Sequence, residues 1–256
     1  MIPRIVPPLT SLAVLITRPV GQAVSLAEAT ERLGGTALLL PAISIVPLEA
    51  TMIVDHDLVI FVSVNAVTHG SRFITKTPTT RIAAIGKTTA AALAEAGLPV
   101  DLVPECGFNS EGLLAHPELN LAASSRVLIV RGAGGRELLQ ETFAAQGCAV
   151  ATLDVYRRAL PAIDAAHRDA IETLWAEGGV NVVTVTSVET LQNLMSLLTE
   201  RGRELLKTTP LLVASRRIMS AAADMGLRGE CVLAPGADDA ALIGALSYWH
   251  GRARGG

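Results

Sequence analysis

Short runs of Val, Ile and Leu recur along the chain, and each is followed by a turn and an amphipathic segment. Such runs are typical of parallel strands that helices cover on both faces, and the segments have the period of helices. The expected pairs are 12–17 with 20–33, 58–62 with a helix after 65, 81–85 with 88–96, 126–130 with 137–146, 181–185 with 189–198 and 211–214 with 217–225. This alternation predicts βαβ units and an α/β fold.

The two halves of the chain also resemble each other, in the same order. LITRPVGQAVSLAEATERLGG matches LIVRGAGGRELLQETFAAQG, VSVNAV matches TSVETL, and AAIGKTTAAALAEAG matches LVASRRIMSAAADMG. These matches place three pairs of residues opposite one another: Arg18 with Arg131, Ser63 with Ser187, and Gly86 with Ser215. Because the spacing is far above the roughly 20–50 residues of a solenoid repeat, it indicates a duplicated domain.

Each half contains one extended stretch, at residues 40–48 and 153–161, in which prolines disfavour helix. The two stretches could pair as a ladder between domains. The first strand would then pack with the end of the chain, across the duplication. In that arrangement residues 12–17 share a sheet with 181–185, and 58–62 share a sheet with 126–130. The residues alone leave this packing open.

Composition restricts the possible partners. The net charge of −3 is spread along the chain without a basic tract, so nucleic acid is not expected as a partner. The histidines have no close pair at ligand spacing, and the three cysteines are far apart. We therefore expect no metal, no disulfide framework and a reducing compartment, the cytoplasm.

Two uncharged runs bear on targeting. Residues 5–17 follow Arg4 as in a signal peptide, but prolines interrupt them and no small-residue cleavage site follows. We interpret this run as a buried first strand. Residues 33–48 contain two prolines and are too few for a membrane span. No membrane partner is expected.

Two patterns resemble nucleotide-binding loops, and both fail at one position. RGAGGRELL follows a strand and opens a helix, but Glu137 occupies the third glycine position of a dinucleotide fingerprint. Gly86-Lys87-Thr88 resembles the end of a P-loop, but Arg81 stands where the first glycine belongs. We therefore expect no nucleotide cofactor.

Small polar residues or glycines stand where several strands end and helices begin. They are Thr17, Ser63 with Asn65, 86–89, 131–135 and Ser187. Helix N-termini favour anions, and strand ends form the ligand crevice of open parallel sheets. Any one of these residues could simply cap a helix, but the set predicts a cleft for a large anion. No G-x-S-x-G elbow is present, so an enzyme of this kind would act by positioning and hydrogen bonding.

Six motifs occur in an order that resembles the uroporphyrinogen-III synthase family: TRP, VSVNAV, AIGKTTAAAL, SEGLL, VRGAGGRELL and VYRR. The resemblance covers nearly the whole chain. One segment departs from it, because ASRRIM at 214–219 stands where many members carry Gly-x-Thr-Thr. Ser215 or Arg216 would have to supply substrate contacts there.

The resemblance implies two similar flavodoxin-like parallel-sheet domains joined by a two-stranded β ladder, with the active site in the interdomain cleft. The first domain would comprise residues 1–40 and 162–256, the second 48–152, and the connecting strands 41–47 and 153–161. It also implies a cofactor-free enzyme of haem biosynthesis. This enzyme cyclises hydroxymethylbilane, a linear polycarboxylate tetrapyrrole, to uroporphyrinogen III with loss of water and inversion of ring D.

The same resemblance suggests a monomer in transient contact with the enzyme that makes hydroxymethylbilane. The alternative is a non-catalytic two-domain binding protein or sensor for a small anion. Tyr156, in VYRR, matches a cleft tyrosine of the family, whose phenol could assist departure of the hydroxyl; otherwise its ring is interdomain packing. The substrate-binding residues we predict are Arg18, Ser63, Asn65, Gly86, Lys87, Thr88, Thr89, Ser110, Arg131, Gly132, Ser187 and Ser215.

Overall fold

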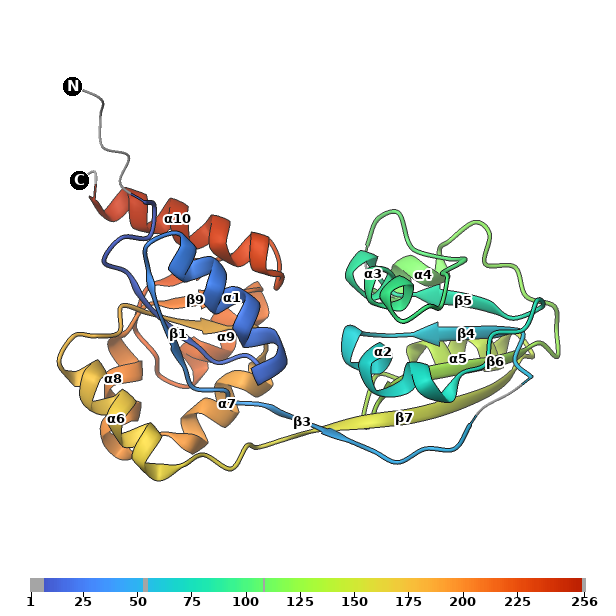
Figure 1. Cartoon of the computed structure of the whole chain (residues 1–256), viewed down its shortest axis with the longest axis horizontal. Helices are drawn as coiled ribbons and strands as arrows, with labels where there is room; N and C mark the ends of the chain where they lie inside the picture. The colour runs from blue at the N-terminus through green and yellow to red at the C-terminus, as the bar shows by residue number, and fades with distance from the viewer. Residues whose placement is uncertain (1–6, 53–54, 108, 255–256) are drawn as a thin grey trace, which may run out of the picture. The chain divides into compact units, whose positions relative to one another are not determined.

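The chain divides into two compact units, each with its own sheet (Figure 1). Unit 1 consists of Met1–Ser44 and Leu160–Gly256, and unit 2 of Ile45–Ala159. The structure, a computed structural model, describes residues 7–52, 55–107 and 109–254. The predicted ends of the first domain, residues 1–6 and 255–256, lie outside the described residues.

The sheet of unit 1 has five parallel strands in the order β10-β9-β8-β1-β2. They are β1 (Ala13–Ile16), β2 (Thr36–Leu39), β8 (Val182–Val185), β9 (Leu211–Val213) and β10 (Cys231–Leu233). Taken in chain order, this is the 2-1-3-4-5 arrangement of flavodoxin-like sheets. The predicted fold class is therefore confirmed.

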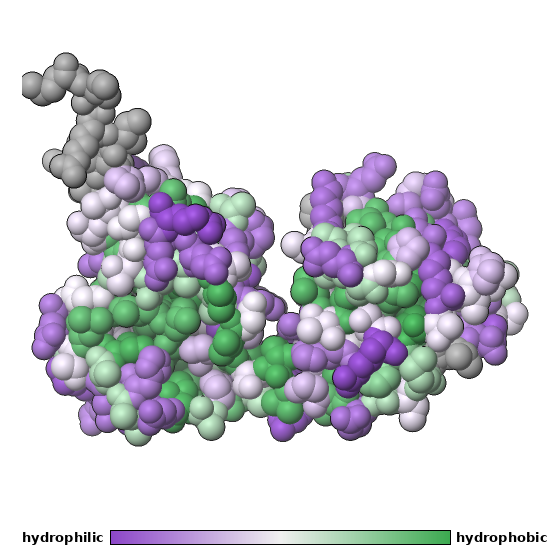
Figure 2. Space-filling view, viewed as in Figure 1, coloured by the Kyte–Doolittle hydropathy of each residue, from purple (hydrophilic) through white to green (hydrophobic). Residues whose placement is uncertain are grey.

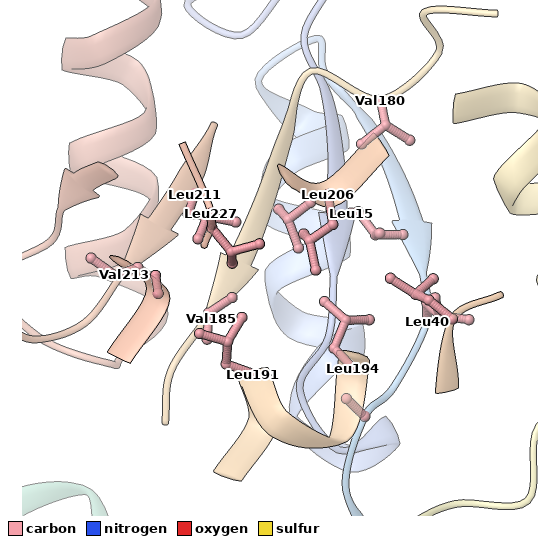
Figure 3. Packing of buried hydrophobic residues seen from close by; sticks show 14 of the residues in the cluster. Leu15, Leu40, Val180, Val185, Leu191, Leu194, Leu206, Leu211, Val213 and Leu227 are labelled. Carbon is pink, nitrogen blue, oxygen red and sulfur yellow. The ribbon is translucent and has the colours of Figure 1, made fainter. Parts of the chain in front are cut away.

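Helices cover both faces of this sheet. They are α1 (Val20–Arg32), α6 (Ala165–Ala176), α7 (Val188–Leu197), α8 (Glu200–Thr208), α9 (Arg216–Asp224) and α10 (Asp239–Arg254). Side chains of α1 and α10 share a hydrophobic cluster on one face, while α6 to α9 pack on the other. Figure 3 shows this second cluster, in which Leu15 of β1 and Val185 of β8 lie close to Leu191 and Leu194 of α7.

The sheet of unit 2 has the order β3-β7-β6-β4-β5. Its strands are β3 (Ser44–Pro47), β4 (Leu58–Phe61), β5 (Arg81–Ala84), β6 (Arg126–Gly132) and β7 (Ala149–Ala159). Its helices are α2 (Val64–Gly70), η1 (Ser71–Phe73), α3 (Lys87–Glu95), α4 (Ser110–Leu114) and α5 (Leu138–Ala145). The first three pack on one face of the sheet and the last two on the other.

The predicted pairing across the duplication is confirmed. Strand β1 pairs with β8 in parallel, with Val14 opposite Val182, and β4 pairs with β6, with Leu58 opposite Val127. The two sheets also match strand by strand. Strands β2, β1, β8 and β9 of unit 1 correspond in order to β7, β6, β4 and β5 of unit 2. The counterpart of β10 is a single parallel bridge from Ala83 to Leu102. Strand β3 is an addition at the edge of unit 2.

The two extended stretches are hydrogen-bonded neighbours, as β3 and β7. Strand β7 begins at Ala149 rather than at 153, because its first residues pair with β6 from Arg126 onward. The ladder therefore continues into the sheet of unit 2. The hydrophobic pattern predicted no separate strand at residues 36–39, but these residues form strand β2 in the sheet of unit 1.

The surfaces of both units mix hydrophilic and hydrophobic residues (Figure 2), as expected for helices that bury one apolar side. Among the described residues, no helix combines the length and the apolar character needed to cross a membrane.

We predict that Gly70→Ala destabilises unit 2. A Cβ at this last residue of α2 would lie 2.6 Å from Cγ1 of Val130 and 3.2 Å from Cγ1 of Val155. Valine is stiff at χ1, so the overpacking should lower the free energy of unfolding by about 1–3 kcal/mol. Urea denaturation measures this. The control is Gly244→Ala in α10, where a Cβ meets nothing within 4 Å; equal midpoints for the two variants would contradict the prediction.

Candidate active site

A cavity of about 340 Å³ opens in unit 2 at the carboxyl ends of β4 and β6. The chain leaves β4 toward α2 on one face and leaves β6 toward α5 on the other. This divergence is the switch point at which open parallel sheets bind ligands. The cavity is lined by Val62, Ser63, Ile85, Asn109, Ser110, Ile129, Arg131, Gly132, Gly135, Arg136, Leu139, Tyr156 and Arg158.

The ring of Tyr156 is placed by a break in the β6–β7 register. Arg131 pairs with Asp154, but the next residue, Gly132, pairs with Tyr156, so Val155 is an extra residue. Neighbours on a regular strand face opposite sides, whereas Val155 and Tyr156 join the same hydrophobic cluster. The irregularity turns the Tyr156 ring over Gly132, where a Cβ would lie 2.5 Å from the ring atom Cζ. Only 3% of Tyr156 is exposed.

Ser63 connects the first turn of α2 to this ring. Its Oγ accepts a hydrogen bond from the backbone N–H of Ala66 at 3.0 Å, which makes it the N-cap of the helix. The same Oγ lies 3.2 Å from Oη of Tyr156. The capping role and the contact with Tyr156 therefore coexist in one hydroxyl.

Three of the lining residues are arginines, and none of these described residues is Asp or Glu. Arg131 is nearly buried, and its Nε donates to Oδ1 of Asp154 at 3.0 Å, which fixes the side chain. Arg136 forms a longer, exposed pair with Glu111 at 3.4 Å. Arg158 follows Tyr156 by two residues on β7. A cavity lined in this way favours carboxylates, which arginines bind through charge-assisted hydrogen bonds.

His69 of α2 is the other ring near Tyr156, with 6.1 Å between the ring centroids. Burial, and to a lesser extent the charge of Arg72, lower the pKa of His69 below its ordinary value. This lowered pKa favours the neutral form of the imidazole beside Tyr156.

Several residues predicted in unit 2 lie outside this cavity. Gly86 is the buried N-cap of α3, Lys87 and Thr88 are exposed, and Thr89 is only 4% exposed. Lys87 instead lines a separate pocket of about 450 Å³ with Ala90, Val103, Pro104 and Glu105. Asn65 is half-buried in the first turn of α2. Ser63, Ser110, Arg131, Gly132 and Tyr156 are the predicted residues that the cavity brings together.

The strand ends of unit 1 carry the remaining predicted residues. Arg18 forms a close ion pair with Asp239 and donates to the carbonyl of Ala237 at 2.9 Å. Ser187 caps α7 by accepting from the N–H of Thr190 at 3.0 Å. Ser215 is the N-cap residue of α9, but its side chain makes no capping hydrogen bond.

The sequence did not point to Asn109, Arg136 and Arg158 as lining residues, whereas Gly135 lies within the predicted set 131–135. Arg136 and Arg158 stand inside the motifs VRGAGGRELL and VYRR, so their positive charge was the available signal. Across residues 7–52, 55–107 and 109–254, no cluster of His, Cys, Asp or Glu could hold a metal ion.

The fold and the cavity together define a class: an α/β protein of two similar units whose site suits a ligand rich in carboxylates. The chain matches the family model described as uroporphyrinogen-III synthase HemD over residues 24–244. It is 36% identical to the uroporphyrinogen-III synthase of Salmonella typhimurium over 252 residues, which cover 92% of this chain and 100% of that relative. The chain belongs to the uroporphyrinogen-III synthase family.

Other comparisons agree with this membership. The uroporphyrinogen-III synthase of Escherichia coli is 40% identical over 166 residues, or 64% of this chain and 65% of the relative. Solved structures of the Thermus thermophilus synthase (a mutant) and the Helicobacter pylori synthetase each match with a TM-score of 0.58. The matches cover 96% of this chain and 100% of the first, and 93% of this chain and 99% of the second. Their identities of 19% and 14% support the fold alone.

We predict that Gly132→Ala displaces the Tyr156 ring. The new Cβ would lie within 2.5–2.6 Å of the ring atoms Cζ and Cε2, so the ring has to move. The chain contains two tyrosines, and Tyr248 is 70% exposed in α10. In NMR spectra of tyrosine-labelled protein, the Tyr156 signal should therefore shift while the Tyr248 signal stays in place. An unchanged Tyr156 signal would contradict the observed packing.

Proposed function

We infer that this chain is a uroporphyrinogen-III synthase, which cyclises hydroxymethylbilane to uroporphyrinogen III with loss of water and inversion of ring D. The observation that carries this inference is the arginine-lined cavity at the switch point of unit 2, with Tyr156 among its lining residues. Family membership and the chemistry of the cavity point to the same polycarboxylate substrate.

Carboxylate binding is the first task of such a site. Free bilane closes without inversion, so the enzyme must stabilise one folded transition state over another. A preference of about 2.7 kcal/mol gives a hundredfold bias. Carboxylates held at fixed points can supply it by fixing the conformation of the chain of pyrroles. We assign this binding in unit 2 to Arg131, Arg136 and Arg158, with Ser110 and the backbone at Gly132.

Departure of the hydroxyl is the second task, and we assign it to Tyr156. Its phenol donates a hydrogen bond, and then a proton, to the hydroxyl oxygen as the carbon–oxygen bond breaks and water leaves. The resulting azafulvene is attacked to give a spiro intermediate, and its reopening inverts ring D before closure. The burial of Tyr156 supports this role, because a phenol shielded from bulk water keeps a fixed direction.

The remaining predicted residues are proposed to bind further carboxylates. In unit 2 these are Asn65, Gly86, Lys87, Thr88 and Thr89, and in unit 1 they are Arg18, Ser187 and Ser215. The Ser215 hydroxyl makes no capping hydrogen bond to α9, and the buried Nε of Arg18 has no hydrogen-bond partner; both observations support this assignment in unit 1.

We further propose a cytoplasmic monomer that receives hydroxymethylbilane during transient contact with the enzyme that makes it. The three cysteines are free thiols, which supports a reducing compartment. Direct transfer would limit the spontaneous closure of the free bilane.

The function is tested by supplying hydroxymethylbilane in situ and separating isomers I and III of the product. The chain should give isomer III, whereas a blank without the chain should give isomer I. Isomer I alone in both reactions would leave a binding protein as the remaining interpretation.

Tyr156→Phe should lower kcat by roughly ten- to a hundredfold, because it removes the positioned acid, while KM changes little. Unconverted bilane closes spontaneously, so the product should shift toward isomer I. Tyr248→Phe is the control, since Tyr248 is exposed in α10. Full kcat and pure isomer III from Tyr156→Phe would show that the ring only packs.

Arg158→Gln should raise KM about fivefold, because one solvent-exposed contact between Arg158 and a carboxylate contributes about 1 kcal/mol. Arg157→Gln is the matched control: Arg157 precedes Arg158 on β7, is exposed, and does not line the cavity. Steady-state kinetics at several substrate concentrations separates KM from kcat. Equal KM values for the two variants would remove Arg158 from the binding site.

A further inference from the structure

We propose that Ser63 is a positioning residue for Tyr156, which holds the phenol so that its proton points into the cavity. This inference rests on the proposed function and gives Ser63 a role other than the substrate contact expected from the sequence. Its basis is the single Oγ that lies 3.0 Å from the N–H of Ala66 and 3.2 Å from Oη of Tyr156.

The position of the Ser63 oxygen is fixed by the helix. The N–H of Ala66 belongs to the first turn of α2, and Ala66 is fully buried. This N–H occupies one of the two lone pairs of Oγ and leaves one O–H proton and one lone pair. Oη of Tyr156 lies 3.2 Å from this oxygen, at which distance either hydroxyl can be the donor, and we assign the donation to Ser63.

Donation in that direction has two consequences for the reaction. The phenolic proton cannot point back at Ser63, so it is available to a ligand in the cavity that Tyr156 lines. When Tyr156 gives this proton to the departing hydroxyl and water leaves, the Ser63 O–H stabilises the phenolate by a charge-assisted hydrogen bond. The pyrrole N–H that is lost as the azafulvene forms returns a proton to the phenolate.

Ser187, the counterpart of Ser63 in unit 1, shows that helix capping and the positioning of a phenol are separate roles. Ser187 caps α7 with the same geometry, accepting from the N–H of Thr190 at 3.0 Å. The other neighbour of its hydroxyl is Oγ1 of Thr190 at 2.8 Å, not a phenol. A serine at this position is therefore sufficiently explained by the helix in unit 1, whereas in unit 2 it also contacts the proposed acid.

The first test is Ser63→Ala, which should lower kcat about tenfold with KM within about twofold of wild type. Ser63→Thr keeps a hydroxyl and should restore most of kcat, since threonine also caps helices. Asp164→Ala is the control for cap loss: Asp164 caps α6 by accepting from the N–H of Ala166 at 3.1 Å. It should lower the melting temperature without changing kcat. A Ser63→Ala enzyme with unchanged kcat, or with the loss confined to KM, would overturn the positioning role.

The second test places Ser63→Ala in the Tyr156→Phe background. If Ser63 acts through the phenol, the double variant should have the kcat of Tyr156→Phe alone. If the two substitutions instead lower kcat by factors that multiply in the double variant, Ser63 acts on the substrate directly. That result would overturn the positioning role while leaving the proposed function intact. A wild-type chain that forms no isomer III would overturn both.

Discussion

The ring of Tyr156 can lie against the end of β6 because residue 132 has no side chain. Any Cβ there would lie closer to the ring than van der Waals contact allows, and the extra residue Val155 turns the ring toward this space. The placement of the phenolic oxygen beside Ser63 follows from that contact. Arg131 precedes Gly132 and is held separately, by its ion pair with Asp154 of the same strand pair. The contact at Gly132 thus determines where the proposed acid lies, next to a binding arginine.

The duplication explains why both units have polar strand ends and why they differ. Each unit has an arginine near the carboxyl end of a strand at its switch point, paired with an aspartate: Arg131, within β6, pairs with Asp154, and Arg18, just after β1, pairs with Asp239. Each also has a serine that caps the helix after the neighbouring strand. Only unit 2 adds a buried tyrosine to this framework; the tyrosine of unit 1, Tyr248, is exposed. We therefore expect both units to bind carboxylates and unit 2 alone to supply the acid.

Much of the fold could be predicted because β-branched runs and periodic helices are local signals. The duplication and the proline-containing stretches made the pairing of β1 with β8 one possible arrangement, but the residues alone left it open, and only the family resemblance favoured it. Helix α8 was missed because its sequence, ERGRELLKT, contains few apolar residues, and only Gly202 and Leu206 are buried. Strand β10 is three residues long and only partly buried, and it gives an equally weak signal.

The residues of the site could be predicted only in part, because their arrangement depends on contacts between strands. Motif positions placed Tyr156, Ser63 and Arg131 in one candidate set, but the register shift that brings Tyr156 over Gly132 depends on a contact between β6 and β7. No local pattern encodes that contact. Arg136 and Arg158 were missed because arginines near helix starts and strand ends are usually solvated. Their position in the cavity becomes evident only when the strand ends are assembled.

We propose that the arginine-lined cavity of unit 2 binds carboxylates of the tetrapyrrole beside Tyr156. A crystal structure of the chain with uroporphyrinogen III would show whether it does. We expect at least one carboxylate within hydrogen-bond distance of Arg131, Arg136 or Arg158, with the macrocycle edge facing Oη of Tyr156. A tetrapyrrole bound in unit 2 only at the pocket beside Lys87, with the cavity empty, would contradict it.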